Sequence, residues 1–172
     1  AQRPKAPDEL VRQLGRVREV VQAFNIPVFE MDGYEADDVI GTIARRASAQ
    51  GVNIVIVTGD NDELQLVSER ARVLLPQRGF VASTLCDPGS VQEKYGVSPE
   101  QIPDLKGLQG DPSDNIPGVP GIGPKTAAKL VQQYGSVDGI YQHLDEVAPD
   151  RLRETLRAHE AQARQSRKLA TL

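Results

Sequence analysis

Residues 52–62 read Val-Asn-Ile-Val-Ile-Val-Thr-Gly-Asp-Asn-Asp. The first six form a nearly continuous β-branched run, which is typical of a strand buried on both faces of a parallel sheet. Asp60 and Asp62 follow this run closely. Residues two apart in extended backbone point to the same side, so we expect the two carboxylates to converge at the carboxyl end of the strand. Open α/β sheets place their ligands at that edge.

Helical and extended segments alternate around this run. Residues 8–24 and 35–49 carry apolar side chains near helical spacing, and the short apolar run at 26–29 between them is expected to be a strand. Beyond the central run, residues 63–68 predict a short helix and residues 72–75 another strand. Strands that alternate with helices predict an α/β domain with a mostly parallel sheet flanked by helices.

The pattern changes near residue 100. From there the sequence predicts only helical segments broken by Gly and Pro, at residues 100–109, 124–134, 136–144 and 149–165. We therefore predict two parts. Residues 1–99 form an α/β domain, and residues 100–172 form a helical lobe.

The composition sets limits on the class of protein. The 172 residues, 39% of them hydrophobic, suffice for one core or for one core with a small helical lobe. Cys86 is the only cysteine, which excludes an internal disulfide and fits a reducing compartment such as the cytoplasm. No stretch is apolar enough to span a membrane, and nothing at the start resembles a signal peptide, so we expect no membrane association.

The charge is unevenly distributed. A net charge of −4 by itself argues mildly against nucleic-acid binding. However, bound cations would neutralise the acidic clusters, and the C-terminal segment is rich in basic residues. That segment carries Arg151, Arg153, Arg157, Arg164, Arg167 and Lys168 against Glu154 and Glu160.

Acidic residues gather in three clusters, each at the edge of an apolar segment. The clusters are Glu35, Asp37 and Asp38; Asp60 and Asp62; and Asp111 and Asp114. Each has an ordinary alternative when taken alone: the first could complement a helix N-terminus, with Asp38 as a cap, and the others could form turns. Together in one α/β chain they favour a site for hard divalent cations, which proteins hold with carboxylates from separate segments.

Other kinds of metal site fit less well. An EF-hand that starts at Asp60 would place Leu64 at its fifth position and Gln65 where the turn needs Gly. One cysteine and two distant histidines do not make a usual zinc site. An all-oxygen ligand set indicates Mg²⁺ or Mn²⁺.

Residues 118–126 read Gly-Val-Pro-Gly-Ile-Gly-Pro-Lys-Thr. This is not a P-loop, because Pro124 interrupts the Gly-Lys-Thr order and the nearby prolines disfavour a preceding strand. A helix–hairpin–helix fits better: Gly121 and Gly123 allow a tight turn, and Pro124 suits the first turn of a helix. That helix would present its N-terminus and Lys125 to a backbone phosphate. The alternative is a structural turn that binds nothing.

Four motifs together resemble the 5′-nuclease domain of bacterial DNA polymerase I, a relative of the flap endonucleases. They occur in the family's order and with similar spacings. The motifs are Gly33-Tyr-Glu-Ala-Asp-Asp38, Thr58-Gly-Asp-Asn-Asp62, Gly110-Asp-Pro-Ser-Asp-Asn-Ile-Pro-Gly118 and Gly121-Ile-Gly-Pro-Lys-Thr126.

The resemblance implies a structure-specific 5′-nuclease of DNA replication and repair that uses two divalent cations, Mg²⁺ or Mn²⁺. It implies that Glu35 and Asp37 serve the first ion. The second ion is implied to be held or supported by Asp60, Asp62, Asp111 and Asp114. Asp38 belongs to the same motif as Glu35 and Asp37, and it completes the implied set of catalytic residues.

The resemblance also implies the partners. These are duplex DNA with a 5′ flap, a nick or a 5′ end, and a DNA polymerase fused to this part of the parent chain. The implied DNA contacts are Arg3, Gly121, Ile122, Gly123, Lys125 and Thr126, with a K⁺ ion at the hairpin in many relatives.

In the family, a strand with an Asp ligand and a helical arch precede the segment that matches Ala1, and Arg3 matches the end of the arch. We therefore expect this chain to be the C-terminal, larger part of the domain. Besides the nuclease, two alternatives remain open at this point. One is a module that binds duplex or junction DNA without cleaving it, and the other is a PIN-type ribonuclease, which would normally lack the hairpin lobe.

Overall fold

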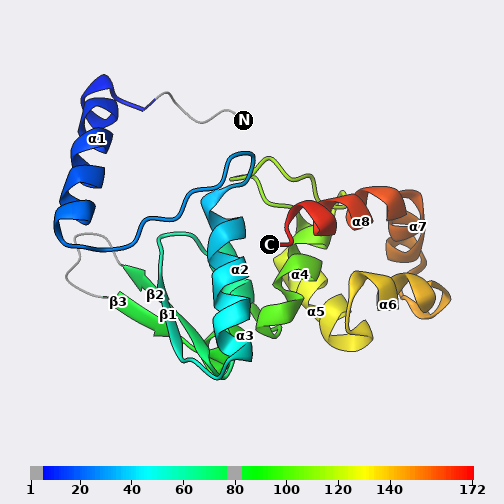
Figure 1. Cartoon of the computed structure of the whole chain (residues 1–172). Coiled ribbons are helices and arrows are strands. Elements are labelled where there is room, and N and C mark those ends of the chain that lie inside the picture. The colour runs from blue at the N-terminus through cyan, green and yellow to red at the C-terminus, as the bar shows by residue number, and fades with distance from the viewer. Residues whose placement is uncertain (1–5, 77–82) are drawn as a thin grey trace. The chain divides into compact units, whose positions relative to one another are not determined.

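The computed structural model describes residues 6–76 and 83–172 of the chain (Figure 1). It divides into two compact units, Ala1–Val39 and Ile40–Leu172. None of the helices in the described residues is both long and apolar enough to cross a membrane.

The first unit contains helix α1 (Asp8–Ala23). Asp8 and Glu9 lie in its first turn, where negative charge is favourable next to the helix dipole. The chain turns after the helix at Asn25, which adopts a left-handed φ of 55°. The helix expected at residues 8–24 is therefore confirmed. The strand expected at residues 26–29 is wrong, because no described strand pairs with this apolar run, and a strand needs such a partner for its backbone groups.

The second unit contains a three-stranded sheet in the order β1-β2-β3. Strand β1 (Ile54–Val57) pairs in parallel with β2 (Ala71–Pro76). This confirms the strands expected at residues 52–57 and 72–75. Strand β3 (Ser83–Cys86), which the sequence did not indicate, pairs antiparallel with β2. The α/β class is confirmed, and the described sheet contains one parallel and one antiparallel pair.

Only one face of β1 is buried. Ile56 is 6% exposed, whereas Val55 and Val57 are 58% and 65% exposed. The expectation of a strand covered on both faces is therefore wrong for the described residues. The β-branched run predicted the strand correctly, because such side chains favour extended backbone, but it did not report how many faces are covered.

Helices make up most of the rest of the second unit. The helix expected at residues 35–49 is α2 (Ala36–Ala49), which begins in the first unit and ends in the second. The expected short helix after β1 is the 3-10 helix η1 (Asp62–Leu66). Helix α3 (Pro88–Tyr95) was not anticipated. It begins with a capping box between Asp87 and Ser90 and ends at Gly96, which has a φ of 74°.

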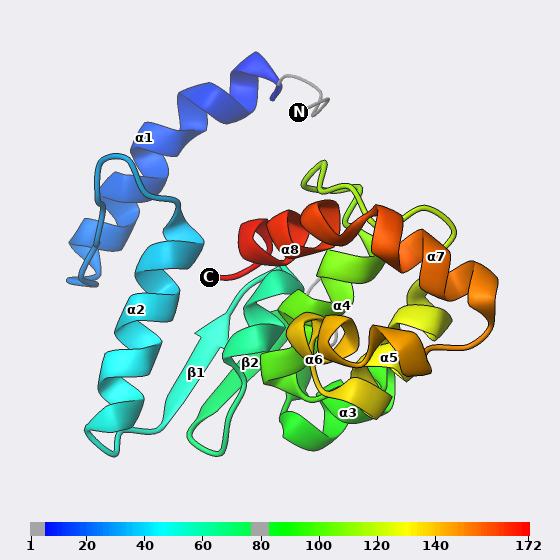
Figure 2. The ribbon, with the colours of Figure 1, turned by 90° about the vertical axis from the view of Figure 1, so that its right-hand side faces the viewer.

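The helical segments expected after residue 100 are confirmed, with the last one broken at His159 into two helices. They are η2 (Pro99–Gln101), α4 (Ile102–Gln109), α5 (Pro124–Tyr134), α6 (Val137–Gln142), η3 (Leu144–Glu146), α7 (Asp150–Ala158) and α8 (Glu160–Leu169). Helices α4 to α8 gather beside the sheet in both ribbon views (Figures 1 and 2).

Helix α4 lies at the centre of this helical lobe. Its residues from Ile102 to Leu108 are all buried. Its closest packing is with α8: a Cβ on Gly107 would lie 2.8 Å from the Cβ of Arg167. The buried carboxylate of Asp104 accepts a hydrogen bond from the Val137 amide (2.8 Å) and pairs with Arg167 Nε (2.8 Å). This contact ties α4 to both α6 and α8.

The loop that follows α4 closes on itself. Asp111 and Ile116 exchange two backbone hydrogen bonds of 2.9 and 2.8 Å. Gly110, with a φ of 79°, and Gly118 bring their backbones together at the base of the loop. A Cβ on Gly118 would lie 2.3 Å from the carbonyl carbon of Gln109, so the loop can close only with glycine at this position.

We expect Gly118→Ala to destabilise the protein, because the added methyl group would meet backbone atoms that cannot move aside. Overpacking of this kind costs about 3 kcal/mol, which corresponds to a fall of roughly 6–12 °C in Tm for a chain of this size. Differential scanning calorimetry measures this. The matched control is Gly123→Ala, where a Cβ would meet no atom of the described residues within 4 Å. Similar Tm values for the two variants would show that closure of the loop does not require glycine at position 118.

Candidate functional site

The second and third acidic clusters meet in the second unit. Asp62 begins η1 after strand β1, and Asp111 and Asp114 lie in the closed loop after α4. One carboxylate oxygen from each of these three residues lies within 4.8 Å of the others. Oxygen atoms this close, drawn from two separate segments, are suited to a hard divalent cation.

Asp60 has a different position from the one expected. The backbone turns at Asn61 (φ −78°, ψ −10°), so residues 60–62 are not extended and the expected same-side alternation is wrong. Instead, Asp60 Oδ1 accepts a hydrogen bond of 2.9 Å from the Asp62 amide, and the Asp60 amide donates to Thr58 Oγ1 (3.0 Å). Asp60 therefore orients the start of η1, from which Asp62 projects.

Lys106 of α4 pairs with two of the three clustered carboxylates. Its Nζ lies 2.6 Å from Asp111 Oδ2 and also donates a hydrogen bond to Asp62 Oδ1. The Lys106 side chain is only 10% exposed. Lys106 was not among the site residues predicted from the sequence. Its burial and its contact with Asp62 depend on tertiary packing, so no local pattern identifies it.

Burial and charge act in opposite directions on these groups. Burial raises the pKa of Asp62 to about 6, against the opposing effect of Lys106. Burial also tends to raise the pKa of Asp111, but hydrogen bonds from Lys106 and Ser113 outweigh it and leave that pKa lowered. Burial tends to lower the pKa of Lys106, whereas the two carboxylates raise it and win, so the amine stays protonated.

The first acidic cluster lies at the start of α2, in the unit Ala1–Val39. The backbone amide of Glu35 donates a hydrogen bond of 3.1 Å to Asp38 Oδ2. This contact matches the capping alternative for Asp38. Asp37 lies in the first turn of the same helix.

The glycine hairpin leads directly into α5. Gly121 has a φ of 77°, and Gly123 is the N-cap residue, followed by Pro124 in the first turn. Ile122 is 4% exposed, and its amide donates to the Val119 carbonyl (3.1 Å), so it anchors the hairpin in the core. Lys125 is exposed and Thr126 half-buried. Arg3, the remaining expected DNA contact, lies outside the described residues.

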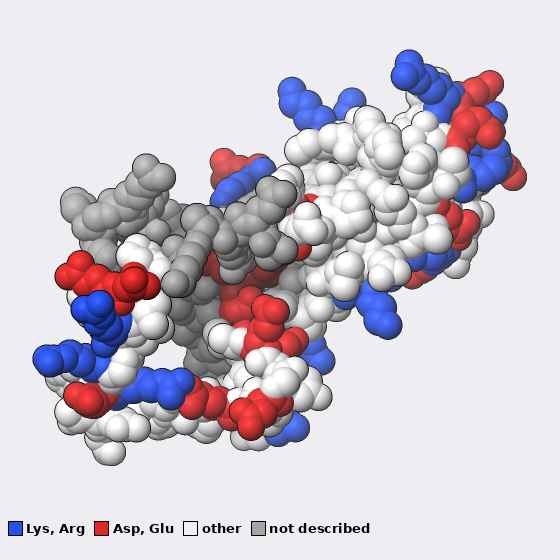
Figure 3. Space-filling model, turned by 90° about the horizontal axis from the view of Figure 1, so that it is seen from above, with Lys and Arg blue, Asp and Glu red and all other residues white. Residues whose placement is uncertain are grey.

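The arginines of α7 and α8 are largely engaged within the lobe. Arg153 pairs with Asp150 (2.8 Å), and Arg157 pairs with Asp145 (2.8 Å). Arg164 pairs with Glu160 (2.8 Å). Acidic and basic side chains both occur on the face seen in Figure 3. The basic excess counted in residues 151–172 therefore does not translate directly into a free positive surface.

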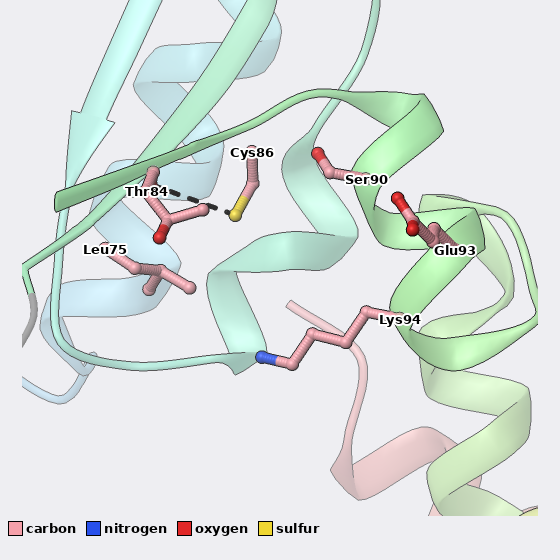
Figure 4. Close-up of a pocket in the computed structure, with 6 residues that line it drawn as sticks. All are labelled: Leu75, Thr84, Cys86, Ser90, Glu93 and Lys94. Atoms are coloured by element: carbon pink, nitrogen blue, oxygen red, sulfur yellow. Dashed lines mark hydrogen bonds between the residues drawn. The ribbon is translucent and has the colours of Figure 1, made fainter.

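A hollow lies between the sheet and α3 (Figure 4). It has a volume of about 540 Å³ and is lined by Leu75, Thr84, Cys86, Ser90, Glu93 and Lys94. Its lining includes apolar, polar and charged side chains. Burial raises the pKa of the Cys86 thiol. One residue links it to the acidic site: Lys94 Nζ donates a hydrogen bond of 3.1 Å to Asn61 Oδ1.

The raised pKa of Asp62 predicts a pH dependence of stability. Its folded value of about 6 lies above its ordinary value of 3.8, so between these values the folded state binds the proton more tightly than the unfolded state. The stabilisation is present below the unfolded value and is lost as the pH rises through the folded one. In chelator, the Tm of the wild type should therefore fall relative to that of Asp62→Asn as the pH rises from about 4 to about 6. A Tm difference between the wild type and Asp62→Asn that stays constant across this pH range would contradict the raised pKa of Asp62.

Two family models match adjacent parts of the chain. Residues 1–96 match the 5′-3′ exonuclease N-terminal resolvase-like domain, and residues 97–172 match the 5′-3′ exonuclease C-terminal SAM fold. The second match agrees with the helical lobe described above.

Curated relatives match over nearly the whole chain. DNA polymerase I of Bacillus caldotenax is 47% identical over 170 residues, which are 99% of this chain and 19% of that protein. DNA polymerase I of Chloroflexus aurantiacus is 48% identical over 175 residues, which cover 100% of this chain and 18% of that protein. The chain thus spans about a fifth of the length of these relatives.

Solved structures share the fold. A T5 5′-exonuclease variant matches with a TM-score of 0.82 at 24% identity, covering 94% of this chain and 64% of that one. A complex of bacteriophage T5 flap endonuclease with DNA and metal ions matches with a TM-score of 0.80 at 23% identity, covering 98% and 62% of the respective chains.

The family matches cover both parts of the sequence, and they confirm the resemblance carried by the four motifs. The chain therefore belongs to the 5′-3′ exonuclease family and corresponds to the 5′-nuclease part of its DNA polymerase I relatives.

Proposed function

We propose that this chain is the 5′-nuclease part of a bacterial DNA polymerase, and that it hydrolyses phosphodiester bonds of duplex DNA at a 5′ flap, a nick or a 5′ end. The observation that carries the proposal is the meeting of Asp62, Asp111 and Asp114 within 4.8 Å, in a chain of the exonuclease family. A cytoplasmic location follows from this function, because bacterial DNA lies there.

The residues present fit a divalent metal. The cluster offers only carboxylate oxygens, and it already attracts one cation, the ammonium group of Lys106. We assign Asp62, Asp111 and Asp114 to one Mg²⁺ or Mn²⁺ ion, with Asp60 orienting the start of η1. We assign Glu35 and Asp37 to a second ion, as the family resemblance implies, and Asp38 to the cap of α2. When bound, divalent ions would stabilise charge on the phosphate and make water a better nucleophile.

The chain's own residues supply the geometry for this chemistry. The closed loop holds Asp111 in place, because Asp111 Oδ1 accepts hydrogen bonds from both the amide (2.9 Å) and the hydroxyl of Ser113. Helix α4 precedes the loop and is buried, which anchors the start of the loop in the core. In this division of labour, residues 1–99 provide most of the acidic residues. Residues 100–172 provide DNA binding and contribute Asp111 and Asp114 to the metal site.

DNA binding is assigned to the hairpin. Gly121 and Gly123 bring the backbone close to a phosphate without interfering side chains, and the N-terminus of α5 favours negative charge. Lys125 is exposed next to that N-terminus, and Thr126 follows it. Arg3 is assigned to the same partner by resemblance. A K⁺ ion held by the hairpin carbonyls belongs to the same proposal.

Removal of a clustered carboxylate tests the nuclease. Loss of groups that merely support a metal ligand costs 10–100-fold, so Asp111→Asn or Asp114→Asn in the full-length polymerase should reduce cleavage of a 5′-flap substrate by at least about 100-fold. Polymerase activity of the same preparation serves as the internal control. Asp145→Asn, at a carboxylate with 92% exposure, is the matched control and should cleave normally. Normal cleavage by both cluster variants would refute the proposal.

The second candidate, a module that binds duplex DNA without cleaving it, is favoured by the exposed hairpin in front of α5. One experimental result would distinguish it from the nuclease. The full-length protein would bind duplex DNA in a salt-sensitive way and yet cleave no flap substrate in the presence of Mn²⁺. Both candidates assign the same role to the hairpin.

We expect Lys125→Ala combined with Gly123→Val to weaken duplex binding and to spare Mn²⁺ binding. The loss of one phosphate contact should reduce the slope of log affinity against log salt by about 1. Fluorescence anisotropy over a range of salt concentrations measures this. Lys129→Ala removes an exposed charge one turn further along α5 and is the matched control. Unchanged affinity in the double variant, or an equal loss in the control, would refute the hairpin assignment.

A further inference from the structure

Helix α4 carries a lysine where a buried helix would ordinarily carry an apolar residue. Lys106 is 8% exposed and is flanked by Leu105, Gly107 and Leu108, all of them buried. A buried ammonium group is strongly destabilising unless it is paired and hydrogen-bonded. Its pairing with Asp62 and Asp111 meets this requirement. The lysine therefore belongs to the acidic site rather than to the surface of the helix.

The ammonium group contacts two of the three carboxylates to which we assign a divalent ion. Its Nζ approaches carboxylate oxygens directly, at 2.6 Å in the case of Asp111 Oδ2. The same oxygens cannot serve the ammonium group and a divalent ion at short range without strong repulsion between the two cations. Only one of them can use the full charge of this carboxylate pair at a time.

Lys106 is not needed to orient Asp111. The other oxygen of that carboxylate, Oδ1, is held by the amide and hydroxyl of Ser113, and the backbone of Asp111 is fixed by its two hydrogen bonds with Ile116. Asp62 is likewise positioned through its amide, by Asp60. Both carboxylates keep their supports when the lysine is removed, so what the lysine adds is positive charge.

We propose that Lys106 is an internal counter-ion that competes with divalent metal for Asp62 and Asp111. It holds the two segments together when no metal is bound, and its ammonium group leaves the carboxylate pair when a metal binds. The lysine thereby sets the metal concentration at which the site fills. This inference rests on the metal site of the proposed function and adds a residue that lowers the affinity of that site.

Isothermal titration calorimetry of Mn²⁺ binding to the whole chain tests the proposal. Lys106→Met keeps the length of the side chain and removes its charge, so it should bind Mn²⁺ roughly tenfold more tightly than the wild type. In chelator, the same variant should have a lower Tm, because three carboxylates then face one another without a cation. The rise in Tm on adding Mn²⁺ should be larger than in the wild type.

Two further variants keep the test decisive. Lys106→Arg retains the charge and should bind Mn²⁺ within about threefold of the wild type. Lys129→Met removes an exposed lysine of α5 and should change neither the affinity nor the Tm response. Should the Met variant not fold in chelator, Lys106→Gln provides the neutral side chain, and folding of either variant only in the presence of Mn²⁺ would support the proposal.

Weaker or unchanged Mn²⁺ binding by the neutral variants, with normal binding by the wild type, would overturn the counter-ion role and leave the metal site intact. If neither the wild type nor a neutral variant binds Mn²⁺, then the metal site itself is wrong and both inferences fail. Binding that appears only in the neutral variants would be the strongest support for competition.

Discussion

A buried helix that carries charges must have every charge paired, and α4 is built around this constraint. Its acid, Asp104, is held by the Val137 amide and by Arg167, which ties the helix to α6 and α8. Its base, Lys106, is held by Asp62 and Asp111, which ties it to η1 and to the loop that follows. The same helix thus joins the helical lobe to η1, the segment that follows β1. Asp62 and Asp111 lie at this junction.

The backbone chemistry of the loops serves the same end. Asp111 and Asp114 lie in a loop whose two ends come together at Gly110 and Gly118. The backbones approach so closely there that neither position has room for a Cβ. In the hairpin, the glycines have a different reason. A Cβ on Gly121 or Gly123 would meet no atom of the described residues within 4 Å, so close packing does not require glycine there. Gly121 instead adopts a φ of 77°, which side chains with a Cβ rarely take.

The electrostatics of the site follow from its partial burial. Asp62 and Asp111 both lose solvent, yet their pKa values shift in opposite directions. The difference lies in their partners: Asp111 accepts from both Lys106 and Ser113, whereas Asp62 stands near two other carboxylates, those of Asp60 and Asp114. The site therefore holds one positive charge of its own, the ammonium group of Lys106.

The family and the alternation of strands and helices could be predicted from the sequence alone. These features depend on local periodicity and on short motifs, which are legible without knowing what lies across the core. The sequence did not predict β3 or α3, because a four-residue strand and an eight-residue helix carry too little periodicity to stand out. It also misjudged residues 26–29 and the coverage of β1, because strand pairing and burial are decided by distant segments. The contact of Lys106 with both Asp62 and Asp111 was visible only once the fold was known. Asp62 and Lys106 are 44 positions apart in the chain, and packing rather than any local rule brings them together.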